Sequence, residues 1–321
     1  MASPPYKPGN PVSIPLLLFS TAVAGSGPWT ISEGDTSVYL GVESQRLERL
    51  TQSSGAGGDD VLDVDDGLET TGFKAVVTHG VREDIEVELD VGWFRVEANR
   101  PDGPLCAALG PDTCRTTRGF APLGMRAKWQ FLDEWTGAPV SVAVGAAARF
   151  GQWTGPTRDR TTNLGEGTTD FGPTVAIGRS GGLGDGFWSA HVDGRWLVRQ
   201  SNVAGASPSV PGSEYSIDTE FLAGTQAWWS LGPTLTYWER PQGIDLEDLL
   251  ASPRLATDID RLGRLRARSV RVGGKLLIRS SERTTLVIGG WGTPVAVNNP
   301  LVMGLSAGLS VYPRPADSGA G

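Results

Sequence analysis

Residues 71–97 read TGFKAVVTHGVREDIEVELDVGWFRVE, and the second half of this stretch alternates strictly between two kinds of side chain. A period of two residues is typical of a β-strand with two unlike faces. Such a strand lies either on the surface of a soluble protein or between lipid and an aqueous lumen. Its apolar face consists of Ile85, Val87, Leu89, Val91 and Trp93, and its other face of Glu86, Glu88 and Asp90.

The composition of the 321-residue chain favours an all-β protein. Its 44 glycines and 22 prolines disfavour a helical protein, because both residue types are poor helix formers. Aromatic and β-branched residues, including 11 tryptophans, are frequent enough to disfavour disorder. The length fits two average domains or one large all-β domain.

The first 24 residues predict a secretory signal peptide. The apolar run SIPLLLFSTAVA at 13–24 ends in an Ala-Val-Ala sequence, which matches a cleavage site before Gly25. A buried strand or a poorly ordered terminus is the alternative. No other segment approaches the ~20 apolar residues that a spanning helix needs. We therefore expect an exported chain with a main domain at 25–313 and a tail at 314–321.

Charge and cysteine content narrow the choice of partners. The net charge is −8, and removal of residues 1–24 leaves 27 basic and 36 acidic residues, a net charge of −9. A nucleic-acid partner is disfavoured, because such partners require a basic face. The two cysteines, Cys106 and Cys114, lie in one predicted loop of an exported chain and predict a local disulfide. Two free thiols are the alternative, and a metal site is less favoured because no histidine is close in sequence.

Twelve segments between residues 36 and 312 show the strand pattern, and long connections alternate with short ones. The long connections are 51–66, 98–119, 153–168, 200–213 and 241–263. Alternate connections of an up-and-down sheet lie at opposite ends, so one end carries long loops and the other tight turns, as in outer-membrane barrels. An even number of strands also closes the sheet without an unpaired edge in lipid. We predict a transmembrane up-and-down antiparallel β-barrel of about 12 strands. A large soluble β-sandwich or a blade repeat is the alternative, but it leaves the one-sided loop lengths unexplained.

The tryptophans support the membrane interpretation if the chain starts on the periplasmic side. Most then fall near strand ends, as expected for two aromatic belts at the membrane interfaces. Trp291 lies nearer mid-strand and fits poorly. The predicted outer belt contains Trp93, Trp153, Trp196 and Trp238, and the inner belt contains Trp129, Trp135, Trp188, Trp228 and Trp229.

If the apolar faces meet lipid, the opposite faces line a lumen that carries charges of both signs. These charges either satisfy one another and hold a narrow barrel rigid, or form a polar permeation path. Both interpretations remain, because a 12-stranded barrel is intermediate between a filled barrel and an open porin. The candidate lumen and permeation residues are Glu86, Glu88, Asp90, Arg126, Lys128, Arg149, His191, Asp193, Arg195, Asp218, Glu220, Arg271 and Lys275.

A hydrolase inside the barrel is a weaker interpretation. It would need a positioned nucleophile and base or a pair of carboxylates. His79 adjoins a predicted tight turn and is expected to be solvated, whereas His191 shares a strand face with Asp193. The pattern places neither Ser141 nor Ser189 beside that pair. No catalytic motif is recognisable, and no cofactor is predicted.

Two further stretches are interpreted as surface loops. DDVLDVDDGLE at 59–69 has spaced carboxylates but lacks the spacing of an EF-hand, so a solvated outer loop is favoured over a calcium site. IDLEDLLASPRLATDIDRL at 244–262 has apolar residues at near-helical spacing. It predicts either a short helix at the barrel mouth or an ordinary loop.

Four segments resemble the outer-membrane transporters named for the phenol-degradation meta pathway. They are GFKAVVTHGVREDIEVELDVGW at 72–93, LGMRAKWQFLDE at 123–134, GAPVSVAVGAAARF at 137–150 and TTDFGPTVAIGRSGG at 168–182. In that family a strand ends in a glycine-centred turn, and a Gly-x-x-x-Lys strand ends in an acidic turn. The resemblance implies a 12-stranded barrel that passes small, often hydrophobic, compounds, and it assigns no catalytic residue. This chain departs from the usual aromatic end of bacterial barrels, because nine residues follow Tyr312.

The sequence therefore predicts a passive channel or transporter for small molecules, hydrophobic ones included, in the bacterial outer membrane. Its expected partners are outer-membrane lipid and a small-molecule solute, with no nucleic acid. The oligomeric state is not predicted. The main alternative is a structural or adhesive barrel whose own charges plug the lumen.

Overall fold

The computed structural model describes residues 14–15, 27–53, 59–98, 116–151, 162–163, 168–201, 213–225, 228–242 and 266–312. Apart from one 3-10 turn, η2 (Glu134–Thr136), its regular elements are β-strands. Among the described residues, no helix is long and apolar enough to span a membrane. The strands are β1 (Ile14–Pro15), β2 (Thr36–Ser53), β3 (Asp59–Arg82), β4 (Ile85–Ala98), β5 (Thr117–Phe120), β6 (Leu123–Leu132), β7 (Ser141–Phe150), β8 (Thr162–Asn163), β9 (Thr168–Leu183), β10 (Gly186–Ser201), β11 (Glu214–Thr225), β12 (Trp229–Arg240), β13 (Ala267–Ser281), β14 (Thr284–Val297) and β15 (Pro300–Val311).

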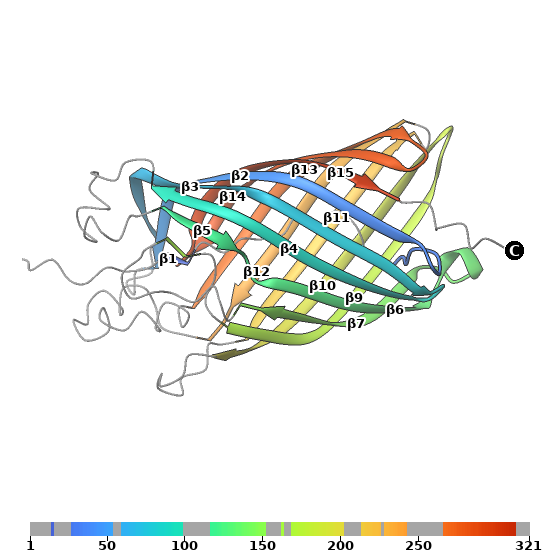
Figure 1. Cartoon of the computed structure of the whole chain (residues 1–321), viewed down its shortest axis with the longest axis horizontal. Helices are drawn as coiled ribbons and strands as arrows, with labels where there is room; N and C mark the ends of the chain where they lie inside the picture. The colour runs from blue at the N-terminus through green and yellow to red at the C-terminus, as the bar shows by residue number, and fades with distance from the viewer. Residues whose placement is uncertain are drawn as a thin grey trace, which may run out of the picture.

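The long strands form one closed antiparallel barrel (Figure 1). Each strand pairs with its neighbours in chain order, and β15 returns to pair with β2, which closes the ring. β5 and β6 both pair with β4, one after the other, so together they fill one strand position. The barrel therefore has 12 strand positions, which confirms the predicted fold. β1 and β8 form a separate two-stranded parallel pair.

The two ends of the barrel differ. At one end, here named the turn end, strands are joined through the short turns at 83–84, 184–185 and 282–283 and through η2. The opposite end, here named the loop end, carries the connection at Asn298–Asn299 and the longer connections, which lie largely outside the described residues. Cys106, Cys114, the tail at 314–321 and most of the 241–263 loop also lie outside them.

The outer surface of the barrel is apolar. Among the largest exposed hydrophobic side chains are Leu40, Phe73 and Leu305, which are 59%, 63% and 69% exposed. Aromatic pairs occur toward both ends of this surface: Trp196 stacks on Tyr215 toward the loop end, and Trp188 on Phe221 toward the turn end. Because the alternation buries polar side chains and exposes apolar ones, the lipid face is outside and the polar face is inside.

Three sequence expectations need correction. The acidic stretch at 59–69, predicted to be a solvated outer loop, belongs to β3, which pairs with β2 as far as Ser53↔Asp59. The predicted strand at 120–132 is interrupted at 121–122, where a proline lacks a ladder donor. Trp238 is not in the outer belt, because it is 3% exposed and lies inside the barrel, as does Trp291 at 7%. A register shift between Val270 and Val272 marks a bulge in β13.

Candidate functional site: the charged lumen

The carboxylate row of β4 faces the lumen, as its alternation predicts. Glu86 is 1% exposed, and its Oε1 lies 3.1 Å from Lys128 Nζ on β6. Further along the row, Glu88 pairs with Arg126, and Asp90 pairs with Lys74 of β3. The register explains these partners, because Glu86↔Lys128 and Glu88↔Arg126 are directly opposite across the β4–β6 ladder.

Residues 27–35, here named the inner segment, lie against the inner wall at the turn end. Lys128 Nζ donates to the backbone oxygens of Gly27 and Trp29, at 3.0 and 2.6 Å. The backbone N–H of Ile31 donates to Glu86 Oε2 at 3.1 Å. The Glu86–Lys128 pair thus binds the inner segment as well as joining two strands.

Further contacts extend the inner segment across several strands. The indole N–H of Trp29 donates to Glu134 in η2, and the Trp29 ring lies edge-on to His191 of β10, with ring centroids 5.9 Å apart. The N–H of Gly34 donates to Gly80 O of β3 at 2.8 Å. Contacts that run from β3 through η2 to β10 place the inner segment across the lumen at this end.

Arg126 crosses the middle of the lumen. It belongs to β6, yet its Nη1 lies 2.7 Å from Asp193 Oδ2 on β10, beyond β7 and β9. Its Nη2 lies 3.4 Å from Glu88 Oε2 on the other side. One guanidinium therefore links two carboxylates from separate parts of the wall, and it narrows the passage at this level.

A second cluster of side-chain ion pairs joins several strands near the loop end. Glu214 of β11 binds three arginines: Arg149 at 2.7 Å, Arg199 at 3.2 Å and Arg240 at 2.9 Å. Asp170 of β9 also binds Arg149 and Arg199. Glu214, Asp170, Arg199 and Arg240 are all at most 3% exposed. Because these groups join five strands from β7 to β12, we assign the cluster to barrel rigidity.

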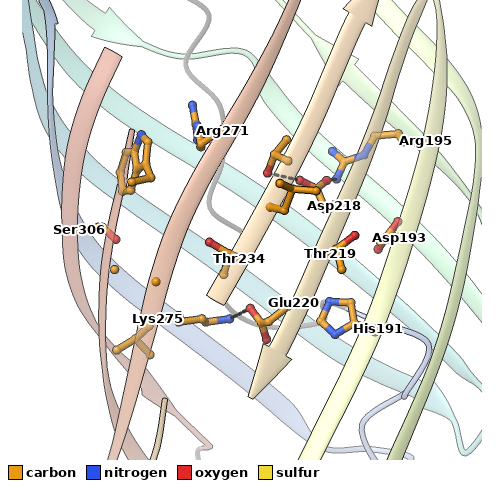
Figure 2. A pocket seen from close by; sticks show the side chains of 17 residues that line it. His191, Asp193, Arg195, Asp218, Thr219, Glu220, Thr234, Arg271, Lys275 and Ser306 are labelled. Atoms are coloured by element: carbon orange, nitrogen blue, oxygen red, sulfur yellow. Dashed lines mark hydrogen bonds and ion pairs between the residues drawn. The ribbon is translucent and has the colours of Figure 1, made fainter. Parts of the chain in front are cut away.

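A pocket remains open along the inner wall formed by β10 to β15 (Figure 2). It holds about 720 Å³ of empty space, part of it continuous with solvent. Lys275 Nζ lies 2.6 Å from Glu220 Oε2, and Arg195 Nη2 lies 3.5 Å from Asp218 Oδ2. The charged side chains of this pocket are His191, Asp193, Arg195, Asp218, Glu220, Arg271 and Lys275.

Large inward rings lie flat on the wall over glycines and so leave the lumen space open. A Cβ at Gly304 would lie 2.3 Å from the Trp291 ring, and a Cβ at Gly308 would lie 2.4 Å from the Tyr39 ring. A Cβ at Gly72 would likewise lie 2.4 Å from the Phe94 ring. Each ring needs a neighbour without a side chain, which accounts for part of the high glycine content.

The charged lumen residues predicted from the sequence lie on the inward faces of their strands, and Glu86–Lys128 and Glu88–Arg126 pair between adjacent strands. Asp193 binds Arg126 rather than orienting His191, and Ser141 Oγ accepts from Glu134 N–H. The described residues therefore do not assemble a Ser-His-Asp arrangement from these groups. They also contain no cluster of three or more His, Cys, Asp or Glu suited to a metal.

Several lumen residues were missed from the sequence. The alternation along β9 places Asp170 on the same face as Thr174, so this signal was available in the sequence. Glu43 and Lys74 likewise follow the parity of their strands. The inner segment had no such signal, because it precedes the first barrel strand. The missed charged residues are Glu43, Lys74, Asp170, Arg199, Glu214 and Arg240.

Comparison with solved structures supports the fold. The chain is similar to the COG4313 outer membrane channel from Pseudomonas putida F1, with a TM-score of 0.67 and 14% identity over 91% of this chain and 100% of that chain. Weaker likenesses include the NanC porin (TM-score 0.45, 12% identity, 85% of this chain and 98% of that chain) and a Pseudomonas aeruginosa FadL homologue (0.34, 7%, 89% and 91%). A scan against protein-family models and a search of curated proteins found no match. The closed barrel and its apolar outer belt identify the chain as a β-barrel of the bacterial outer membrane.

Proposed function

We propose that the protein is a narrow passive channel for small polar solutes. The observation that carries this proposal is the open pocket inside the barrel, whose wall holds ion pairs, hydroxyl groups and glycines beside the apolar side chains of Val287 and Trp291. A solute on this path meets charged groups throughout, because Arg126 and the Glu86–Lys128 pair line the remaining route toward the turn end. Polar solutes are therefore favoured over the hydrophobic compounds that the family resemblance implies.

The inner segment restricts this channel at the turn end. Hydrogen bonds to Lys128, Glu86 and Gly80 hold it in place, and it is not itself a strand of the barrel. We expect low single-channel conductance for the full chain in a planar bilayer, and slow swelling of liposomes in small sugars and amino acids. The alternative is a barrel plugged permanently by its own charges, and Arg126 bridging the lumen favours it.

Removal of residues 27–33 tests the channel directly. This deletion removes the contacts to Lys128, Glu86 and Glu134 but leaves every barrel strand, so single-channel conductance should rise. Trp29→Ala should produce a smaller rise. Trp135→Ala is the matched control, because Trp135 lies at the same end but is 76% exposed. Absence of conductance and of solute flux in both the full chain and the deletion variant would support the plugged barrel instead.

A further inference from the structure

The pocket between β10 and β15 displays equal numbers of full positive and negative charges. Its cations are Arg195, Arg271 and Lys275, and its anions are Asp193, Asp218 and Glu220. The two signs come from neighbouring strands and face the same space (Figure 2). A solute with net charge of either sign would meet as many repelling groups as attracting ones, whereas a dipolar solute can satisfy both sets.

Three buried polar atoms beside the pocket lack a hydrogen-bond partner among the described residues. Asp193 is 4% exposed, and its Oδ1 is an acceptor with no hydrogen-bond partner among the described residues. Trp291 is 7% exposed, and its Nε1 is a donor with no hydrogen-bond partner among the described residues. The donor Arg195 Nε also has no such partner. Unmet groups of this kind are costly when buried, so the polar groups around this pocket are not fully satisfied by one another.

Arg271 lies over the Trp291 ring and interacts electrostatically with the carboxylate of Glu43 on β2. Its guanidinium carbon lies 5.1 Å from the centre of the Trp291 ring, and that ring rests against Gly304 on the wall. Stacking fixes the plane of a guanidinium while its N–H groups stay directed along the edges. Such an edge matches the two oxygens of a carboxylate.

Acceptors for a cationic group stand two strands away. Asp218 belongs to β11 and Arg271 to β13, with β12 between them, so their backbones are about 10 Å apart at the usual strand spacing. Asp218 accepts from Thr236 Oγ1 at 2.7 Å, which holds its carboxylate toward the pocket. Thr234 and Ser306 add small hydroxyl side chains beside these groups, and Gly289 adds none.

We propose that this pocket binds small zwitterions whose carboxylate and ammonium groups are separated by several bonds. The carboxylate binds Arg271, and the ammonium binds Asp218 with its neighbours Glu220 and Asp193. The inference rests on the proposed function in one respect only, that solutes reach the lumen. The proposed site selects zwitterions by charge, whereas the width of a channel alone selects solutes only by size.

Calorimetric titration of the full-length refolded protein in detergent tests this inference without any measurement of flux. The probes are γ-aminobutyrate, butyrate and butylamine, which share a chain length and differ in charge, at one ionic strength. γ-Aminobutyrate should bind at least about tenfold more tightly than either single-charge probe, as expected for one added charge-assisted contact. Glycine, with its charges close together, should bind more weakly than γ-aminobutyrate.

Two variants should each remove one half of the γ-aminobutyrate site, the carboxylate-binding half or the ammonium-binding half. Arg271→Gln should reduce γ-aminobutyrate affinity to that of butylamine, and Asp218→Asn should reduce it to that of butyrate. Arg82→Gln is the control, because Arg82 is an exposed arginine at the turn end. Heat-modifiable gel mobility checks that each variant folds, and the wild-type probe series decides the matter if a variant does not.

Equal affinity for all three probes, no binding of γ-aminobutyrate, or the same shift in both variants would overturn the inference. Failure of this inference is separable from failure of the channel proposal. Conductance without γ-aminobutyrate binding removes the zwitterion site alone. Binding without conductance removes the channel alone.

Discussion

Glu86 and Lys128 each make two kinds of contact inside the lumen. Their ion pair joins β4 to β6, and both side chains also bind the backbone of the inner segment. Both are buried, at 1% and 4% exposure. A buried pair tolerates the joint loss of its members better than the loss of one, because a single loss leaves an uncompensated charge.

Glu86→Ala should lower the free energy of unfolding by about 3–5 kcal/mol, since Lys128 loses its carboxylate partner. The double variant Glu86→Ala with Lys128→Met should recover a large part of that loss. Urea unfolding of the refolded barrel, followed by tryptophan fluorescence, measures both. Equal destabilisation of the single and double variants would contradict the assignment of Lys128 as the affected group.

Gly304→Val should move the Trp291 ring away from the wall, because the glycine position has no room for a Cβ beside that ring. Overpacking of this kind costs about 1–3 kcal/mol. The displaced ring would enter the pocket, so conductance should fall along with stability. Gly274→Val is the matched control, because a Cβ at Gly274 would meet only Gly232 O, at 3.9 Å. Unchanged conductance in Gly304→Val would show that Trp291 does not border the path.

Each strand has one face toward lipid and one toward the lumen, and β9 shows this alternation. Asp170, Thr174 and Ala176 are buried inside the barrel, whereas Phe171, Val175 and Ile177 are exposed outside. The hydrogen-bond ladder satisfies the backbone of both faces, so side-chain polarity alone decides which face meets lipid. A one-residue slip would exchange the faces, and this fixes the register strongly.

Val175→Arg should destabilise the barrel by about 2–4 kcal/mol, the usual cost of a charge on the lipid face near the bilayer midplane. Val175→Thr should cost much less. Refolding into lipid vesicles, with the folded fraction measured across a urea series, gives both values. A loss of similar size in the two variants would mean that this face of β9 does not contact hydrocarbon.

The whole lumen is nearly balanced in charge, because its acidic and basic groups are arranged in pairs and clusters. Fixed net charge along a pore selects ions by sign, and paired charges cancel most of that field. We therefore expect weak ion selectivity despite the many charged side chains. A reversal potential close to zero under a potassium chloride gradient is the expected measurement. A value near the equilibrium potential of either ion would show that one sign dominates the path.

Strand number, direction, face assignment and most lumen charges follow from the sequence, because alternation and loop spacing are local properties of the chain. The inward orientation of Trp238 and Trp291 was not predicted from these local patterns. Their places near a strand end and in mid-strand do not show which face carries them. For Trp291, the ring fits inside because Gly304 on the adjacent strand has no side chain. The strand structure of the acidic stretch at 59–66 was not predicted either, because pairing with β2 outweighs the poor strand propensity of aspartate.

Contacts across the lumen were decided only by the closed barrel. No local pattern links Arg126 to Asp193, or Lys128 to the backbone of Gly27, since the chain separates these partners by 67 and 101 residues. Curvature of the closed sheet brings them together. The carboxylate row of residues 86–90, and its pairing with Arg126 and Lys128 on the adjacent strand, follow from alternation and register. The contacts across the lumen, and the pocket left beside them, depend on how twelve strands close.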